Sequence, residues 1–313
     1  MIFYFCFEGA VPLYPKCDGS KLMGFHRAST RIISFGPAAA LLIASVPLAG
    51  TETASDPTKI PPKQLVREVV NQEVDSSEAD HSRWMYRQQH TDPRSNELKE
   101  CIDTSEGTIC RVLARNGHPL TPQEEQQEIQ QIQELARNPA RLREQQKARR
   151  QDADRALKME QLLPDAFDYE YDGREGRYVC LRFRPALNFR PPDRESRVFH
   201  GMVGSLLVDP ESKRLVAIKG QLVKDVDFGL GLLGRLRRGG SFQVRREEVG
   251  KGVWQTTLLD VNIHGRAIFF RTINARQHEV TDNFKRVPSN LTVAQAASML
   301  EGPLFEARSE HAR

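Results

Sequence analysis

From residue 166 onward, apolar and polar residues alternate with a period of two, the pattern of half-buried β-strands. We expect six to eight strands between residues 166 and 287, joined by tight turns into an antiparallel meander. One such turn is expected at residues 209–212. The residues expected on one apolar face are Val179, Leu181, Phe183, Leu206, Val208, Val216, Ile218, Leu259, Val261, Ile263, Ile268 and Phe270.

The register of the last hairpin is expected to depend on the His-Gly dipeptide at 264–265. A two-residue turn there pairs Val261 with Ile268 and Leu259 with Phe270. The polar residues between them then point to the opposite, solvated face, as in an antiparallel sheet with one buried side.

A helical period of 3.6 residues precedes the strands in two places. The first helix is predicted after Pro62, which suits a first helical turn. Its expected apolar stripe is Leu65, Val66, Val69, Val70 and Val74.

The second helical region, residues 119–163, is rich in Gln, Glu and Arg and poor in apolar residues. Thr121 followed by Glu124 forms a capping box, and the Asn-Pro pair at 138–139 interrupts the pattern. We therefore expect two solvated helices, about 122–137 and 140–163. A final short helix is predicted after Asn290 or Thr292.

Three further strands are predicted between residues 82 and 114, the last two joined by the tight turn TSEG. This hairpin pairs residues whose numbers sum to 211, so Ile102 faces Ile109, Leu98 faces Leu113, and Cys101 faces Cys110. Directly opposed Cα atoms lie about 4.5–5.5 Å apart, which permits a disulfide. We expect a structural Cys101–Cys110 bridge; the alternative is two reduced cysteines that pack together. Cys180 is expected to be an unpaired, buried apolar cysteine.

The expected fold class is therefore α+β: a curled antiparallel sheet, or half-barrel, covered by short helices and interrupted by a charged helical excursion. The segment 226–238 is too apolar for an ordinary loop, and we interpret it as a lid over the apolar face. Its arginines would point outward or toward an anionic head group. The expected lid residues are Phe228, Leu230, Leu232, Leu233, Arg235 and Leu236.

The N-terminal part predicts export. In residues 23–50, Arg27 and Arg31 precede an apolar run and the small residues of LAG, as in a secretory signal peptide. The alternative is an uncleaved membrane anchor. The expected organisation is a signal peptide with an upstream extension over 1–50, a linker over 51–62, and one domain over 63–313. That domain comprises an N-terminal helix and first strands (63–118), the helical insertion (119–163), and the main sheet with the C-terminal helix (164–313).

Little in the sequence indicates catalysis. The 313 residues carry a net charge of +4 and lack HExxH, CxxC and G-x-S-x-G motifs. Asp260 and His264 flank the expected turn, where a solvated histidine is the simpler interpretation. We expect no catalytic residue, no metal ligand and no cofactor. The basic run KARR at 147–150 is interleaved with acidic residues nearby, so it indicates a charged helix face and not a nucleic-acid site.

Several segments carry a resemblance to known proteins. LPDAFDYEY, FRPALNFRPPDRESRVFHGMVGSLLVD, VDFGLGLLGRLRRGGSF and HGRAIFFRTI are similar to a group of exported bacterial proteins, notably from acidobacteria, over about residues 100–290. The strand-turn-strand GSLLVDPESKRLVAIKGQL and the order of elements resemble the LolA/LolB-like superfamily, which includes periplasmic lipoprotein carriers, LppX-type lipid-binding proteins and RseB-type stress sensors. The resemblance implies a half-barrel whose hydrophobic cavity holds acyl chains.

Two functional hypotheses follow. In the first, a periplasmic carrier binds a lipid or a lipoprotein acyl chain against the apolar residues named above. In the second, the sheet is filled by its own side chains, and the protein is a non-enzymatic interaction or stress-sensor module with an envelope protein as partner. The size of the cavity distinguishes the two.

Overall fold

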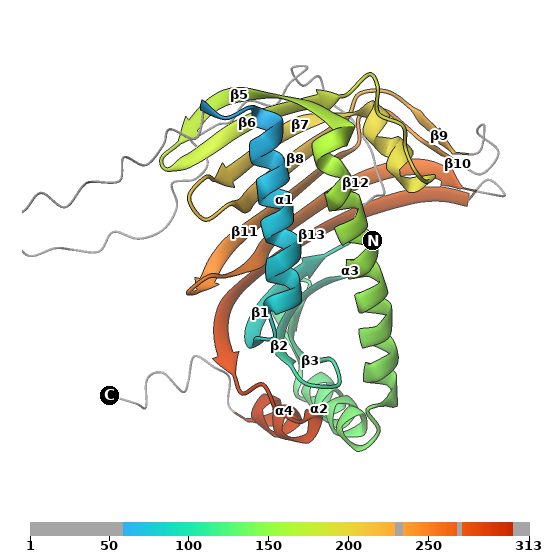
Figure 1. The fold of residues 1–313 in the computed structure, drawn as a ribbon. Coiled ribbons are helices and arrows are strands. Elements are labelled where there is room, and N and C mark those ends of the chain that lie inside the picture. Colours follow the sequence, from blue (N-terminus) through green and yellow to red (C-terminus); the bar gives the residue numbers. More distant parts are fainter. Residues whose placement is uncertain (1–58, 229–233, 268–270, 303–313) are drawn as a thin grey trace, which may run out of the picture.

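The structure, a computed structural model, describes residues 59–228, 234–267 and 271–302 (Figure 1). It is an α+β fold built on one large antiparallel sheet with helices on its faces. The strands are β1 (Arg83–Thr91), β2 (Asn96–Asp103), β3 (Thr108–Arg115), β4 (His118–Pro119), β5 (Phe167–Glu175), β6 (Tyr178–Pro185), β7 (Met202–Asp209), β8 (Arg214–Leu222), β9 (Val226–Phe228), β10 (Gly234–Leu236), β11 (Ser241–Gly250), β12 (Val253–Ala267) and β13 (Arg271–Val287). The helices are α1 (Pro62–Ala79), α2 (Pro122–Arg137), α3 (Ala140–Ala166), α4 (Val293–Glu301) and the 3₁₀ segment η3 (Glu195–Gly201).

Eleven strands form one hydrogen-bonded path in the order β4-β3-β2-β1-β13-β12-β11-β8-β7-β6-β5, and the sheet is not closed into a barrel. Consecutive strands pair along β5–β8 and along β11–β13, as the predicted meander requires. The first three strands join the far end of this meander, because β1 pairs with the last strand, β13. The predicted α+β class with a large antiparallel sheet is thus confirmed. The described part of the chain has nine strands after residue 166, more than the six to eight expected, because β9 and β10 form in the segment interpreted as a lid.

The predicted helices are confirmed. The capping box at the start of α2 is formed by Thr121 and Glu124, and a second one at the start of α4 is formed by Thr292 and Gln295. Asn138 ends α2, as the Asn-Pro pair predicted. Helix α3 continues past the expected end to Ala166.

Helices α1 and α3 lie across one face of the sheet (Figure 1). The largest hydrophobic cluster forms there, between α1, the C-terminal part of α3, η3 and strands β5 to β8, β11 and β12. We call the sheet side of this cluster the apolar face and α1 with the C-terminal part of α3 the covering helices.

Helices α2 and α4 cover a different part of the sheet. Their cluster includes Met85, Ile102 and Ile109 from β1, β2 and β3. Neighbouring strand residues point to opposite faces, so Tyr86 and Cys101 lie on the other side from Met85 and Ile102. Strand β1 pairs with β13, which in turn pairs with β12. These pairings put Tyr86 and Cys101 on the same side of the sheet as Val261 of β12, which belongs to the apolar face. The two helix pairs therefore cover opposite faces of one sheet.

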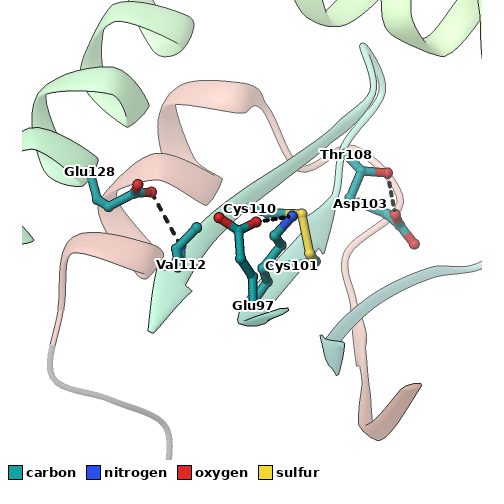
Figure 2. Close-up of a disulfide and its surroundings, with 8 residues drawn as sticks. Glu97, Cys101, Asp103, Thr108, Cys110, Val112 and Glu128 are labelled. Atoms are coloured by element: carbon teal, nitrogen blue, oxygen red, sulfur yellow. Dashed lines mark hydrogen bonds and ion pairs between the residues drawn. A yellow bond between two sulfur atoms is a disulfide. The ribbon is translucent and has the colours of Figure 1, made fainter. Parts of the chain in front are cut away.

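The predicted Cys101–Cys110 disulfide is present and joins β2 to β3, with Cys101 fully buried and Cys110 partly buried (Figure 2). The Cα atoms are 4.1 Å apart, and the predicted pairing of Ile102 with Ile109 is also found. One predicted pair is wrong: Leu98 faces Ala114, because the register shifts between Leu98 and Lys99.

The expectation of an unpaired Cys180 is also wrong. Cys180 is fully buried, as expected, but it is disulfide-bonded, and its partner lies outside the described residues.

The predicted hairpin turn at 264–265 is wrong. Strand β12 continues through both residues, and Val261 pairs with Gln277 while Leu259 pairs with Glu279. The observed partners of Val261 and Leu259 are each nine residues further along the chain than the predicted partners, Ile268 and Phe270. A His-Gly pair permits a turn but does not require one, and here strand pairing on both sides of β12 keeps it extended.

The predicted lid is also wrong for the residues that the structure describes. Residues 226–228 and 234–236 form β9 and β10, and β10 pairs with β12 as a further strand. Arg235 is exposed and forms an ion pair with Asp227, with 2.6 Å between Nε and Oδ1. Leu236 is buried in the main cluster, so this segment extends the sheet instead of covering it. Leu230, Leu232, Leu233 and the side chain of Phe228 lie outside the described residues.

Candidate functional site beneath helices α1 and α3

The predicted apolar face exists and is buried. Ile218 and Leu259 are partly buried and pack against the main cluster. The predicted residues that are at most 5% exposed within it are Val179, Leu181, Phe183, Leu206, Val208 and Val261. Val216 points to the opposite face, because a register shift between Leu207 and Val208 reverses the alternation in β8. The side chains of Ile263, Ile268 and Phe270 lie outside the described residues.

Aromatic rings fill much of the space above this face. Phe183 lies opposite Gly204, and Phe242 lies opposite Gly220. A Cβ atom at Gly204 would lie 2.6 Å from the ring of Phe183 and would overlap a backbone oxygen of β8. The two glycines therefore make room for rings that lie flat on the sheet. The ring of Trp254 belongs to a small cluster on the opposite face.

The remaining cavity under the covering helices is very small. Its volume is about 10 Å³, close to the space that one water molecule needs. It is lined by Val66, Val69, Val70, Glu73, Glu160, Leu163, Leu206, Val208 and Leu215. The covering helices themselves therefore fill nearly all of the space above the apolar face.

Helix α1 covers the face with one aliphatic stripe. Leu65, Val66, Val69 and Val70 are each at most 6% exposed, whereas the predicted fifth member, Val74, is partly exposed. The stripe continues through Glu73, which follows Val69 by four residues and is buried. Side chains three and four residues apart share a helix face, so Glu73 points toward the sheet.

Glu73 forms a buried ion cluster with Arg214 and Arg246. Its Oε1 accepts hydrogen bonds from Arg214 Nε at 3.0 Å and from the Leu215 backbone N–H at 2.9 Å. Its Oε2 accepts from Arg214 Nη2 at 3.1 Å and from Arg246 Nη1. Arg214 also donates to Ser76 Oγ at 2.8 Å. Four donors from β8 and β11 thus hold one carboxylate of α1, which fixes the helix on the sheet.

A second carboxyl group, Glu160 of α3, lines the same cavity. Within the described part of the chain it makes no hydrogen bond and no short ion pair. Burial raises the pKa of Glu160; the charge of Arg246 acts in the opposite direction, and the negative charge of Glu73 adds a smaller increase. Covering the sheet therefore shifts the ionisation equilibrium of Glu160 toward the protonated form.

The outer surfaces of the covering helices are joined by exposed ion pairs. Asp165 of α3 contacts Lys63 at 2.8 Å and Arg67 at 2.9 Å. The hydrogen bond from Lys63 holds the pKa of Asp165 below its usual value. Such exposed pairs contribute about 1 kcal/mol or less, so they align the two helices without locking them.

Neither the ion cluster nor the role of Glu160 in lining the cavity was predicted from the sequence. A signal for Glu73 was present, because a carboxylate within an aliphatic helical stripe indicates a buried cationic partner. The partners themselves could not be identified, since Arg214 and Arg246 are 141 and 173 residues away along the chain.

The arrangement offers apolar contact and one charged cluster, and nothing that resembles a metal site. Among the described residues, no group of three or more His, Cys, Asp or Glu side chains is placed to hold a metal ion. Within the same ranges, no helix has both the length and the apolar character needed to cross a bilayer.

Comparisons with protein-family models, with curated proteins and with solved structures found no match to this chain.

Proposed function

We propose that this protein is a periplasmic carrier that binds a lipid or a lipoprotein acyl chain on the apolar face of a half-barrel, in the manner of the LolA/LolB-like proteins it resembles. The observation that carries the proposal is the helical cover of the apolar face. A continuous apolar surface of six strands is covered by two amphipathic helices that leave a void of about 10 Å³. In this proposal, the ligand takes the place of α1.

The burial free energy of an acyl chain is comparable with that of the aliphatic side chains of α1. Burial of one aliphatic side chain contributes about 1.5–3 kcal/mol, and burial of one methylene about 0.8 kcal/mol. An acyl chain of ~14 carbons therefore offers about 11 kcal/mol, which is similar to the contribution of the four buried aliphatic residues of α1. Neither α1 nor α3 has a side-chain cap at its N-terminus, so local hydrogen bonds do little to retain either helix.

The test weakens the cover without altering the sheet. Val69→Ala removes two methyl groups from the α1 side of the cluster. If ligand and helix compete, the variant binds a fluorescent long-chain acyl probe about tenfold more tightly, because ~1.5 kcal/mol less is needed to displace the helix. Titration of probe fluorescence gives the Kd.

Val74→Ala is the matched control, since it makes the same change on the same helix at a partly exposed position outside the cluster. Its Kd should equal that of the wild type. If Val69→Ala binds the probe no more tightly than Val74→Ala, displacement of α1 is excluded.

The small size of the void favours a second candidate function. In this alternative, the protein is an interaction module whose apolar face stays covered by its own side chains. Its partner would contact the exposed surface of α3, where Lys147 and Arg150 are solvent-accessible. Under this alternative, no variant binds the acyl probe, and the double change Lys147→Glu/Arg150→Glu abolishes cross-linking to an envelope protein that the wild type captures. Probe binding that survives the double change favours the carrier.

A further inference from the structure

The two carboxyl groups in the cavity under the covering helices are the basis of the inference. Glu73 and Glu160 come from different helices, and both line the same small and otherwise aliphatic space. The nearby cations are already engaged, because Arg214 and Arg246 both hydrogen-bond to Glu73. A second negative charge at Glu160 would share this space with the first and would lack a hydrogen-bond donor of its own.

The charged and titratable groups around Glu160 can be assigned to each element that packs against it. On α1 the facing group is Glu73, and the cation of the sheet whose charge acts on Glu160 is Arg246 of β11. Arg214 of β8 is paired with Glu73. Strand β7 contributes only Leu206 and Val208 to the cavity.

The remaining neighbours do not neutralise the group. Tyr169 of β5 donates its hydroxyl to the Leu163 carbonyl at 2.7 Å, and burial raises its pKa so that it stays neutral. Asp165 is held on the outer surface by Lys63 and Arg67. The charged residues of η3, which packs against α3, are Glu195, Arg197 and His200, and the cavity lining includes none of them.

We propose that Glu160 couples the opening of the covering helices to pH: when it ionises beside Glu73, α1 and α3 separate from the apolar face and the ligand enters. This inference rests on the proposed carrier function and adds its regulation. The protein would take up its apolar ligand at neutral pH and favour the closed, unliganded form in acid.

The direction follows from the ionisation equilibrium. In the closed form the pKa of Glu160 is raised by burial, whereas in the open form it returns to the ordinary glutamate value of about 4.3. Below about pH 4.3 the group is protonated in both forms and does not disfavour closure. As the pH rises through this ordinary value toward the raised one, the open form loses its proton first, and closure is progressively weakened.

The experiment measures binding of a pyrene-labelled monoacylglycerol, a probe without a titratable group, between pH 4.5 and 8. For the wild type we expect affinity to rise with pH by about fivefold or more, within the usual range of coupling between two sites. Glu160→Gln resembles the protonated carboxyl, so its affinity should remain at the acid value throughout. Glu144→Gln alters an exposed carboxyl on the same helix and should leave the wild-type pH dependence unchanged.

A ligand-free measurement separates this inference from the carrier function. Hydrogen exchange of the α1 amides, corrected for the intrinsic effect of pH, should show protection that falls as pH rises in the wild type and stays constant in Glu160→Gln. If that difference appears without probe binding, the pH coupling stands and the carrier function fails. If the probe binds with the same pH dependence in both proteins, the carrier function stands and the role of Glu160 is refuted. If neither exchange nor binding distinguishes the two proteins, the role of Glu160 is refuted as well.

Discussion

The two helix-covered regions of this sheet are retained in different ways. Helices α2 and α4 each begin with a capping box and pack on the β2–β3 hairpin, whose strands are joined by a disulfide on the opposite face, whereas α1 and α3 have no side-chain cap. Arg111 of β3 donates to the Leu300 carbonyl of α4 at 2.7 Å, and Glu128 of α2 accepts from the Val112 N–H of β3 at 3.3 Å (Figure 2). The α1/α3 region depends on aliphatic contact and one ion cluster.

This difference indicates which of the two helix-covered regions can separate from the sheet. A disulfide and local caps hold the α2/α4 region whatever lies on the apolar face. Aliphatic contacts can be replaced by another apolar group, and an ion cluster responds to a change in charge. The same sheet can therefore provide one fixed region and one exchangeable region, which is what a carrier requires.

The largest expected effect is that of Glu73→Ala. The substitution leaves Arg214 buried without its carboxylate, and breaking a buried pair in this way costs about 3–5 kcal/mol. Urea denaturation measures the loss of unfolding free energy. The control is Glu68→Ala, which removes the partner of Lys213 at the exposed edge of the same helix and should cost about 1 kcal/mol or less. Equal losses in the two variants would mean that α1 is not held by the ion cluster.

The second prediction concerns the fixed region. Replacement of both Cys101 and Cys110 by alanine opens a loop of nine-residue separation, which should cost about 2–3 kcal/mol of unfolding free energy. If the two regions are retained independently, hydrogen exchange increases in β2 and β3 and stays unchanged in α1. A matching increase in α1 would show that the regions act as one unit and would contradict the comparison.

The third prediction tests whether the apolar face is filled. In Gly204→Ala the new methyl group overlaps the ring of Phe183 and the backbone of β8, and such overpacking costs about 1–3 kcal/mol. Gly250→Ala is the control, because its new Cβ would meet only the Trp84 side chain, at 3.2 Å. Thermal unfolding should show the larger loss for Gly204→Ala. A neutral effect there would show that free space exists above β7.

The sequence predicted what depends on local pattern. The strand period located β5 to β8, the Thr-x-x-Glu box located the start of α2, and the short TSEG turn gave the Cys101–Cys110 pair. These predictions are correct because each depends on residues that are close together in the chain. The fit of Phe183 on Gly204 was missed, although it required only the correct pairing of neighbouring strands.

The wrong predictions share one cause, which is strand pairing that the local sequence does not determine. The turn at 264–265 was misplaced because pairing with β10 and β13 decides whether β12 ends there. Val216 was assigned to the wrong face because a single register shift in β7 and β8 reverses the alternation. The lid was wrong because an apolar segment can cover a sheet or extend it, and only its partner strand distinguishes the two.

The smallest expected effect is that of the α4 cap. Thr292 accepts from the Gln295 N–H at 3.3 Å, and the Gln295 side chain accepts from the Thr292 N–H at 3.0 Å. Thr292→Ala removes the first of these bonds and should cost about 1 kcal/mol. The loss should appear as faster hydrogen exchange in the first turn of α4, with the acyl-probe Kd unchanged, because α4 packs on the face opposite the apolar face on which we propose that the probe binds. A change in that Kd would mean that the fixed region transmits strain to the apolar face, and the separation of the two regions would then have to be abandoned.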